Sequence, residues 1–366
     1  MKWFKTASIL ILVYIILSLA MFPARCAEAA REALELCAGS VAPSLFPFFV
    51  CSSLLVALGA AEIAGRRLSG IMRPVFRVGG AGAVALILGV ISGYPVGAQC
   101  ASELYASGRV TKSEAQRLLA FCNNSGPLFI IGVVGYAMNG SETLGVILYI
   151  IHIVSAILSG IAVSRIFGDE SIDSYTVREP LQAGGVNIGA MFGGAVLKGV
   201  KSILGVCGFV VFFKVAETAL PQFYGRELVD SLLEITGGLS GLSQMQLGSV
   251  LKYSLISMFL AFSGLSVFLQ VSMYASAEGL SMKPYAAGKF LQGIFAFVLT
   301  YLSAGVLKVC GRLGDISYAE AYMPYPDMAP IIPPLDLTRY LILIGGQLVW
   351  CLLFFGIMLL ISGRTD

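Results

Sequence analysis

Two short stretches of the chain place helix-breaking and polar residues inside apolar sequence. One is Asn-Asn-Ser-Gly-Pro, residues 123–127, and the other is Ser-Gly-Tyr-Pro, residues 92–95. Proline lacks an N–H group and has a fixed φ, so it fits the first turn of a helix, and each stretch predicts the start of a half-helix. The unpaired N–H groups and the partial positive charge of such a start favour binding of a carboxylate or another anion. The candidate substrate-binding residues in these stretches are Ser92, Gly93, Tyr94, Pro95, Asn123, Asn124, Ser125, Gly126 and Pro127.

The composition of the chain identifies the solvent around these breaks. Of its 366 residues, 57% are hydrophobic and 12% are charged, and the mean hydropathy is +0.85, which indicates an all-α polytopic membrane protein. In lipid, backbone polar groups must pair within the protein, so a broken helix has to face protein or a wet cavity. Glycine, serine and proline also occur in membrane helices simply for close packing. Two breaks with several polar residues favour a solute site over that alternative.

The apolar runs predict about eight transmembrane helices, because a helix needs roughly 20 apolar residues to cross the bilayer. Two further segments, 80–107 and 227–246, have apolar arms too short to cross. We expect them to form re-entrant hairpins with tips at 92–97 and 236–241. The first crossing could instead be a signal peptide, although a retained helix is favoured. The expected crossings are 7–22, 37–60, 118–138, 144–167, 190–220, 251–275, 286–309 and 340–361.

The two halves of the chain resemble each other at a shift of 141 positions. "LAFCNNSGPL" (119–128) then aligns with "LAFSGLSVFL" (260–269), and the segments before and after them follow in the same order. Each unit would hold a hairpin, a broken helix and an odd number of crossings, so the second copy would be inverted, as in many secondary transporters. Its polar residues would join the site near the bilayer midplane. They are Thr236, Ser240, Ser263, Ser266 and Gln270.

This interpretation divides the chain into five parts and gives it an orientation. Lysine and arginine gather before the first helix and after the second, so the positive-inside rule places those segments, and both termini, in the cytoplasm. The expected parts are an N-terminal helix and loop (1–35), a first repeat (36–168), a linker (169–189), a second, inverted repeat (190–310), and a loop with a C-terminal helix (311–366).

Charged residues inside the predicted helices are further candidates, because they are costly in lipid and usually functional. Lys214 and Glu217 lie three positions apart on one helix face, where they could form a structural pair. Alternatively, Lys214 could offset the charge of an anion and Glu217 could carry a coupling proton. Lys289, at the start of a predicted helix, is expected to anchor that helix at the interface. His152, the single histidine, is expected to be a packed, hydrogen-bonded residue.

Several classes of chemistry find no support in the sequence. The eight cysteines form no C-x-x-C pair, so neither a disulfide framework nor a metal cluster is expected. There is no P-loop, metalloprotease or hydrolase-elbow motif. The net charge of +3 is too small to suggest a nucleic-acid partner. We therefore expect no enzyme activity, cofactor or bound metal.

Longer stretches of the first half carry a resemblance to a known family. "APSLFPFFVCSSLL", "MRPVFRVGGAGAVALILGVISGYPVGAQ" and "VTKSEAQRLLAFCNNSGPLFIIGVVG" resemble the sporulation integral membrane proteins of YlbJ type, which bear the nucleoside-recognition gate domain. The resemblance implies a transporter that moves dipicolinic acid across the outer forespore membrane, beside other sporulation membrane proteins as possible partners. Residues 92–97 and 123–127 match the most recognisable motifs of that family.

The layout of hairpin, broken helix and helix, given twice, is also similar to that of concentrative nucleoside transporters. Fold does not determine substrate, so three functions remain open. They are transport of dipicolinate, transport of a nucleoside or another small polar solute, and a scaffold in the sporulation membrane that transports nothing. The residues alone support a small polar solute such as an anion. In the second half no asparagine or proline occupies the positions of Asn123, Asn124 and Pro127.

Overall fold

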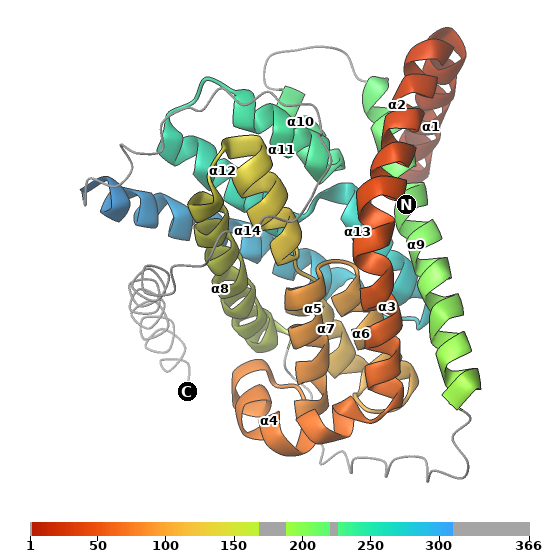
Figure 1. The fold of residues 1–366 in the computed structure, drawn as a ribbon, viewed down its shortest axis with the longest axis vertical. Coiled ribbons are helices and arrows are strands. Elements are labelled where there is room, and N and C mark those ends of the chain that lie inside the picture. The colour runs from red at the N-terminus through yellow and green to blue at the C-terminus, as the bar shows by residue number, and fades with distance from the viewer. Residues whose placement is uncertain (1, 168–187, 220–225, 310–366) are drawn as a thin grey trace.

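The structure is a computed structural model that describes residues 2–167, 188–219 and 226–309, and all regular elements in these ranges are helices (Figure 1). The predicted C-terminal crossing at 340–361 and nearly all of the linker at 169–189 lie outside the described residues. The elements before the linker are α1 (Lys2–Met21), α2 (Pro23–Leu36), η1 (Cys37–Val41), α3 (Ala42–Ala57), α4 (Ala60–Phe76), η2 (Gly80–Gly82), α5 (Ala83–Ser92), α6 (Val96–Ala106), α7 (Lys112–Cys122), η3 (Leu128–Met138) and α8 (Glu142–Ile166). Those after it are α9 (Ile188–Thr218), α10 (Arg226–Leu233), α11 (Ile235–Gln244), α12 (Ser249–Phe262), α13 (Gly264–Ala277) and α14 (Lys283–Val309).

The all-helical membrane class expected from composition is confirmed, but the count of eight crossings is not. Among the described residues, 5 helical segments are long and apolar enough to cross a membrane, or up to 6 if a pair of helices bent by 94° counts as one. The five are Pro23–Ala57, Glu142–Ile166, Ile188–Thr218, Ser249–Ala277 and Lys283–Ser303. The bent pair is Ala60–Phe76 with Gly80–Ser92.

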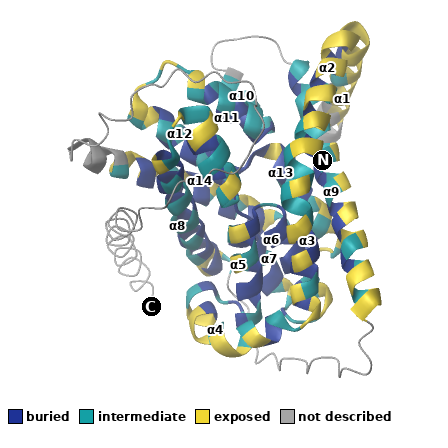
Figure 2. Ribbon diagram, viewed as in Figure 1, coloured by how far each residue is buried: buried dark blue, intermediate teal, exposed yellow. Residues whose placement is uncertain are grey.

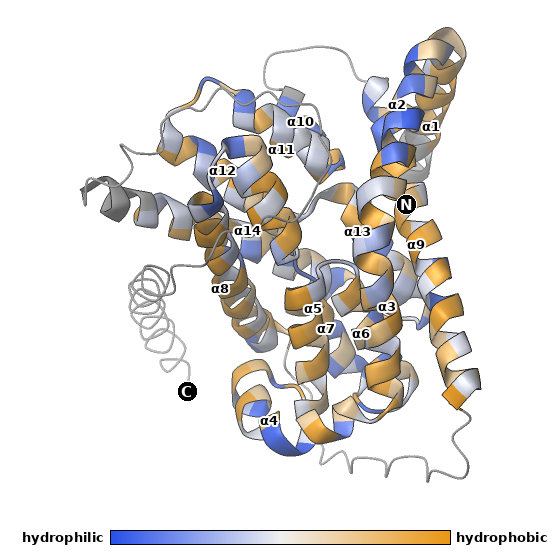
Figure 3. Cartoon of the chain, in the orientation of Figure 1, coloured by the Kyte–Doolittle hydropathy of each residue, from blue (hydrophilic) through white to orange (hydrophobic). Residues whose placement is uncertain are grey.

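The outer helices present apolar side chains to their surroundings. Much of α1 and the first turns of α9 are exposed (Figure 2), and the exposed sides are largely hydrophobic (Figure 3). Leu197 and Leu204 of α9, for example, are 70% and 67% exposed. Helix α9 packs along α2 and α3, which follow one another through the wide turn of η1. Side chains of this kind are stable at such positions only in contact with lipid or with another protein.

The first predicted hairpin and the first predicted helix break are both present. Helices α5 and α6 contain 10 and 11 residues, about 15 Å each, whereas the bilayer core is about 30 Å thick. Neither arm can therefore cross, and the chain reverses at Gly93–Pro95 as expected. Helix α7 ends at Cys122, and the π-helical segment η3 starts at Leu128 after Pro127, which has helical dihedrals. Four residues without helical structure, 123–126, separate them.

In the second half, the predicted helix break is present but the predicted hairpin tip is wrong. Helices α12 and α13 meet at Ser263, which has a left-handed conformation with φ of 72°. The chain turns at Glu234, between α10 and α11, while 236–241 are helical. The Glu234 carboxylate accepts a hydrogen bond of 2.9 Å from the Gly237 backbone N–H and so caps α11. Gly238, which was expected at the hairpin tip, lies within α11 and lets this helix pack closely against α10. A Cβ on Gly238 would lie 2.1 Å from the Ser231 backbone nitrogen.

Helix α7, which leads into the first break, is held at its start by a capping box. Thr111 accepts a hydrogen bond of 3.2 Å from the Glu114 backbone N–H, and the Glu114 carboxylate accepts one of 2.8 Å from the Thr111 N–H. The same carboxylate accepts a second hydrogen bond, of 2.7 Å, from the Gly79 N–H. Glu114 therefore ties α7 to the loop before η2 as well as closing its own first turn.

Thr111→Ala is expected to lower the free energy of unfolding by about 1 kcal/mol, because it removes one partner of the capping box. Thermal unfolding of the purified protein in detergent measures the effect. Lys112→Ala, a change of the exposed neighbouring residue, is the matched control. Equal unfolding temperatures for the two variants would show that the cap contributes little.

Candidate functional site

The hairpin tip and the helix break lie directly against each other. A Cβ on Gly89 or Gly97, one on each arm of the hairpin, would lie 1.7 or 2.0 Å from the Cys122 carbonyl oxygen. Gly93, with φ of +89°, would place a Cβ 2.8 Å from the Gly126 backbone nitrogen. Only glycine fits at these distances, so the end of α7 is inserted between the two arms of the hairpin. The structure thus brings the two polar stretches of the first half together.

Three buried residues of the break are held by other helices. Asn123 donates a hydrogen bond of 3.3 Å to the Tyr285 hydroxyl of α14, and the Ser125 backbone N–H donates one of 3.0 Å to His152 Nε2 of α8. Asn124 donates to the Phe121 carbonyl at 2.7 Å. The three break residues are at most 1% exposed. His152, expected to be packed and hydrogen-bonded, is 1% exposed and makes this bond.

Lys289 of α14 belongs to the same group of side chains, and the expectation of an interfacial anchor is wrong. The residue is 2% exposed. Its ammonium donates a hydrogen bond of 2.8 Å to Gln292 Oε1, and Gln292 Nε2 donates one of 3.1 Å to Asn124 Oδ1. The helix begins at Lys283, so Lys289 lies more than one turn inside it, on the face that packs against α7 and α8. We refer to Asn123, Asn124, Ser125, His152, Lys289 and Gln292 as the central polar cluster.

The central polar cluster has more hydrogen-bonding capacity than it uses. Among the described residues, no carboxylate forms an ion pair with Lys289, and Asn123 Oδ1 and His152 Nδ1 have no hydrogen-bond partner. Ser92 Oγ, at the end of α5 in the adjoining hairpin, has none either. A neutral imidazole that accepts at Nε2 carries its proton on Nδ1, so His152 still has a donor to offer. Burying an ammonium group without a counter-ion is costly. The buried ammonium and the imidazole N–H have no anionic partner among the described residues, which suits the cluster to an anion.

The predicted site residues of the second half lie elsewhere. Gly264 packs against the end of α10, where a Cβ would lie 3.3 Å from the Ser231 carbonyl oxygen, so the second break meets the second hairpin. Ser263, Ser266 and Gln270 are buried, and Gln270 donates a hydrogen bond of 3.3 Å to Ser266 Oγ. Ser240 and Thr236 are partly exposed on α11. In the described part of the chain, no hydrogen bond connects these side chains with the central polar cluster.

Lys214 and Glu217 form the pair that their spacing indicated, with 3.9 Å between Nζ and Oε2. Glu234 lies close to this pair. The three charged groups surround Gly237, where a Cβ would lie 3.4 Å from Glu217 Oε2, 3.6 Å from Lys214 Nζ and 3.7 Å from Glu234 Oε2. Glu217 and Glu234 are both 6% exposed. Glu234 is not among the predicted site residues, although a lone acidic residue in "SLLEITGG" is a signal of a functional position in a membrane protein.

Tyr285 and Gln292 were missed as well. Tyr285, Lys289 and Gln292 are spaced at i, i+4 and i+7, so they share one face of α14. Gly288 permits the close approach of that face, because a Cβ there would lie 2.6 Å from the Ala120 carbonyl oxygen. The Gly288 carbonyl in turn accepts a hydrogen bond of 2.5 Å from Ser159 of α8. The available signal in the sequence was that these three polar residues form a stripe along one face of an otherwise apolar helix.

These observations define a helical integral membrane protein that encloses a polar cluster at the junction of a hairpin and a broken helix. The family model Gate, described as nucleoside recognition, matches residues 38–167. Sporulation integral membrane protein YlbJ of Bacillus subtilis (strain 168) is 31% identical over 316 residues, which cover 75% of this chain and 76% of that protein. No solved structure matches. The chain belongs to the family of sporulation integral membrane protein YlbJ.

Proposed function

We propose that this chain is a membrane transporter that moves a small organic dianion, dipicolinic acid, across the outer forespore membrane during sporulation. The main support is Lys289, a buried cation that no described carboxylate neutralises. Gln292 connects it to Asn124 in the helix break that precedes Pro127. Charged residues inside a membrane protein that face its interior are commonly functional. A carboxylate of the solute would provide the missing counter-ion.

The order of the elements supports inverted repeats as the basis of transport. Helix α14 begins at Lys283, 141 positions after the start of α8 at Glu142, and the break at Ser263 comes 141 positions after Cys122, the last residue of α7. In this proposal the repeats 36–168 and 190–310 have opposite orientation, and their hairpins, breaks and final helices are equivalent. The long helix of the second repeat, α14, then contributes Lys289 to the site at the helix break of the first repeat.

Access to the site requires movement. The side chains of the central polar cluster are at most 2% exposed, so the described conformation is closed around them. The hairpin tip at Gly93–Pro95 and α14 lie on two sides of the break, and separation of either one would open the cluster. Movement of one repeat against the other around a fixed site is the usual mechanism of such transporters.

The choice of dipicolinate rests on the family resemblance, while the physical argument supports an anion. Lys289 would neutralise one carboxylate, and the His152 N–H, the Ser92 hydroxyl and the start of η3 would bind the second. A nucleoside is the second candidate, favoured by the description of the matching family model. A neutral nucleoside, however, would leave the charge of Lys289 uncompensated.

Asn124→Ala combined with Pro127→Ala is expected to lower the dipicolinate content of spores, with normal membrane insertion. The first change removes the acceptor of Gln292, which positions Lys289, and the second removes the residue that starts η3. A buried donor left without its acceptor costs about 1–3 kcal/mol, and about 1.4 kcal/mol corresponds to a tenfold lower rate. Asn139→Ala, at the far end of η3, is the matched control. Wild-type dipicolinate content in the double variant would contradict the site.

A further inference from the structure

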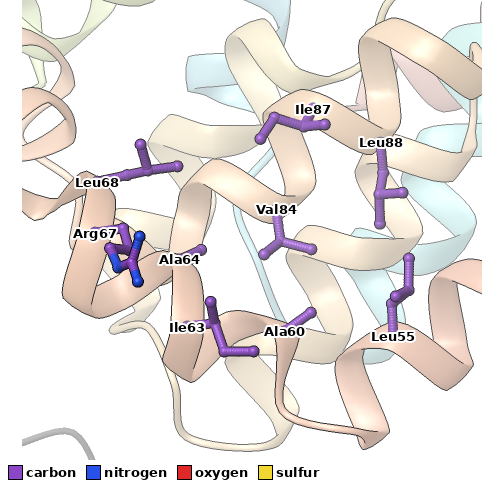
Figure 4. Close-up of a pocket in the computed structure, with 9 residues that line it drawn as sticks. All are labelled: Leu55, Ala60, Ile63, Ala64, Arg67, Leu68, Val84, Ile87 and Leu88. Carbon is purple, nitrogen blue, oxygen red and sulfur yellow. The ribbon is translucent and has the colours of Figure 1, made fainter.

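A pocket on the outside of the protein lies apart from the central polar cluster. It has a volume of about 380 Å³ and is lined by nine residues of α3, α4 and α5 (Figure 4). Eight of the nine are apolar, and the remaining one is Arg67. Val84, Ile87 and Leu88 follow one another along one face of α5, and Arg67 lies at the opposite side of the pocket from Leu55 and Leu88 (Figure 4). The pocket is therefore a long apolar surface with a cation at one end.

The helix that carries Arg67 has the features of a helix at a membrane surface. Helix α4 is bent by 94° relative to the following segment Gly80–Ser92, which contains the apolar helix α5. One side of α4 holds exposed arginines and the other packs through Ala61 and Met72. Ile63 and Ile71 are 58% and 60% exposed. Amphipathic helices with basic residues and exposed aliphatic ones lie in the headgroup region of a bilayer.

The arginines on α4 have no ion-pair partner in the part of the chain that the structure describes. Arg66, Arg67 and Arg73 are all exposed, and none of them forms an ion pair with a described carboxylate. The nearby Glu62 is already occupied, since Arg109 binds it at 2.6 Å. An anion is therefore expected at the Arg67 end of the pocket. The apolar remainder, with Ile87 47% exposed, is open to the lipid beside it.

We propose that this pocket binds one anionic phospholipid of the adjoining leaflet. Its phosphate lies on the Arg67 guanidinium, and one acyl chain lies along Val84, Ile87 and Leu88 between α3, α4 and α5. The cationic end of the pocket matches the anionic headgroup of such a lipid, and the wholly apolar remainder matches its acyl chain. Helix α5 is one arm of the first hairpin, and the tip of that hairpin contacts the helix break. The lipid therefore packs against the outer side of this hairpin. The proposal does not depend on what the protein transports.

The test is native mass spectrometry of the full chain extracted from bilayers that contain equal amounts of phosphatidylglycerol and phosphatidylcholine. We expect the wild-type protein to retain one phosphatidylglycerol, and Arg67→Gln to bind it about fivefold more weakly, the usual effect of one basic residue at a membrane surface. Arg66→Gln, which removes an exposed arginine outside the pocket, is the matched control and should retain the lipid. Leu88→Trp, which fills the apolar end, should reduce retention without any change of charge.

Three outcomes would overturn the proposal. They are equal retention of the two lipids by the wild-type protein, equal losses in Arg67→Gln and Arg66→Gln, and a change of oligomeric state in Leu88→Trp with no bound lipid in the wild type. The second would indicate a diffuse electrostatic effect, and the third a protein contact at this face. Transport assays of the same variants separate this proposal from the transport function, because Arg67 lies outside the central polar cluster.

Discussion

Lys289→Met is expected to reduce dipicolinate uptake at least about 30-fold, because removal of one partner of a buried, hydrogen-bonded charge pair costs 2 kcal/mol or more. The residue is the buried cation of the central polar cluster, and its ammonium is held by Gln292. Methionine keeps the length of the side chain but cannot bind a carboxylate. Initial uptake rates in proteoliposomes with equal amounts of inserted protein provide the measurement.

The stability of the same variant separates a binding role from a structural one. A buried ammonium without a counter-ion destabilises the solute-free protein, so Lys289→Met is expected to unfold at the same or a higher temperature than the wild type. Lys283→Met, at the exposed start of the same helix, is the control and should transport normally. If Lys289→Met both transports normally and is less stable, the lysine is a structural residue and the proposed site is wrong.

Gly89→Ala is expected to abolish transport and to lower the free energy of unfolding by about 1–3 kcal/mol, the range for overpacked cores. The added Cβ would lie 1.7 Å from the Cys122 carbonyl oxygen, which is backbone and cannot rotate away. The hairpin would have to separate from the end of α7, and Gly93 would lose its contact with Gly126. Thermal unfolding in detergent and uptake in proteoliposomes measure the two effects.

Gly208→Ala is the matched control for that change. Gly208 lies within α9, where a Cβ would have no neighbour within 4 Å. Alanine favours a helix over glycine by up to about 1 kcal/mol, so this variant should be at least as stable as the wild type and fully active. Equal behaviour of the Gly89 and Gly208 variants would mean that the hairpin and the break are not tightly packed in the working protein.

The features that follow from local chemistry could be predicted from the sequence. Pro95 and Pro127 mark helix starts because proline fits the beginning of a helix and lacks an N–H group, and helical segments follow directly after both, at Val96 and Leu128. The short arms of the first hairpin follow in the same way from the limited length of apolar sequence on each side of Gly93. Membrane class follows from composition alone.

The features that depend on packing between distant segments could not be predicted. The local sequence predicts an interfacial position for Lys289, because nothing near it in the chain shows that Gly288 lets α14 approach Ala120. The second hairpin tip was misplaced because glycines that permit close helix packing look the same in sequence as glycines that make a turn. Gly238 packs against Ser231, and the turn is made at Glu234.

Uptake of labelled dipicolinate into proteoliposomes of the full chain tests the central claim most directly. The assay is run with and without a pH gradient, and with nucleosides as competitors. The proposed function predicts saturable uptake that needs Lys289 and that an excess of nucleoside leaves unchanged. No uptake under any gradient by correctly inserted protein, or uptake that nucleosides suppress, would contradict a dianion transporter with Lys289 at its centre.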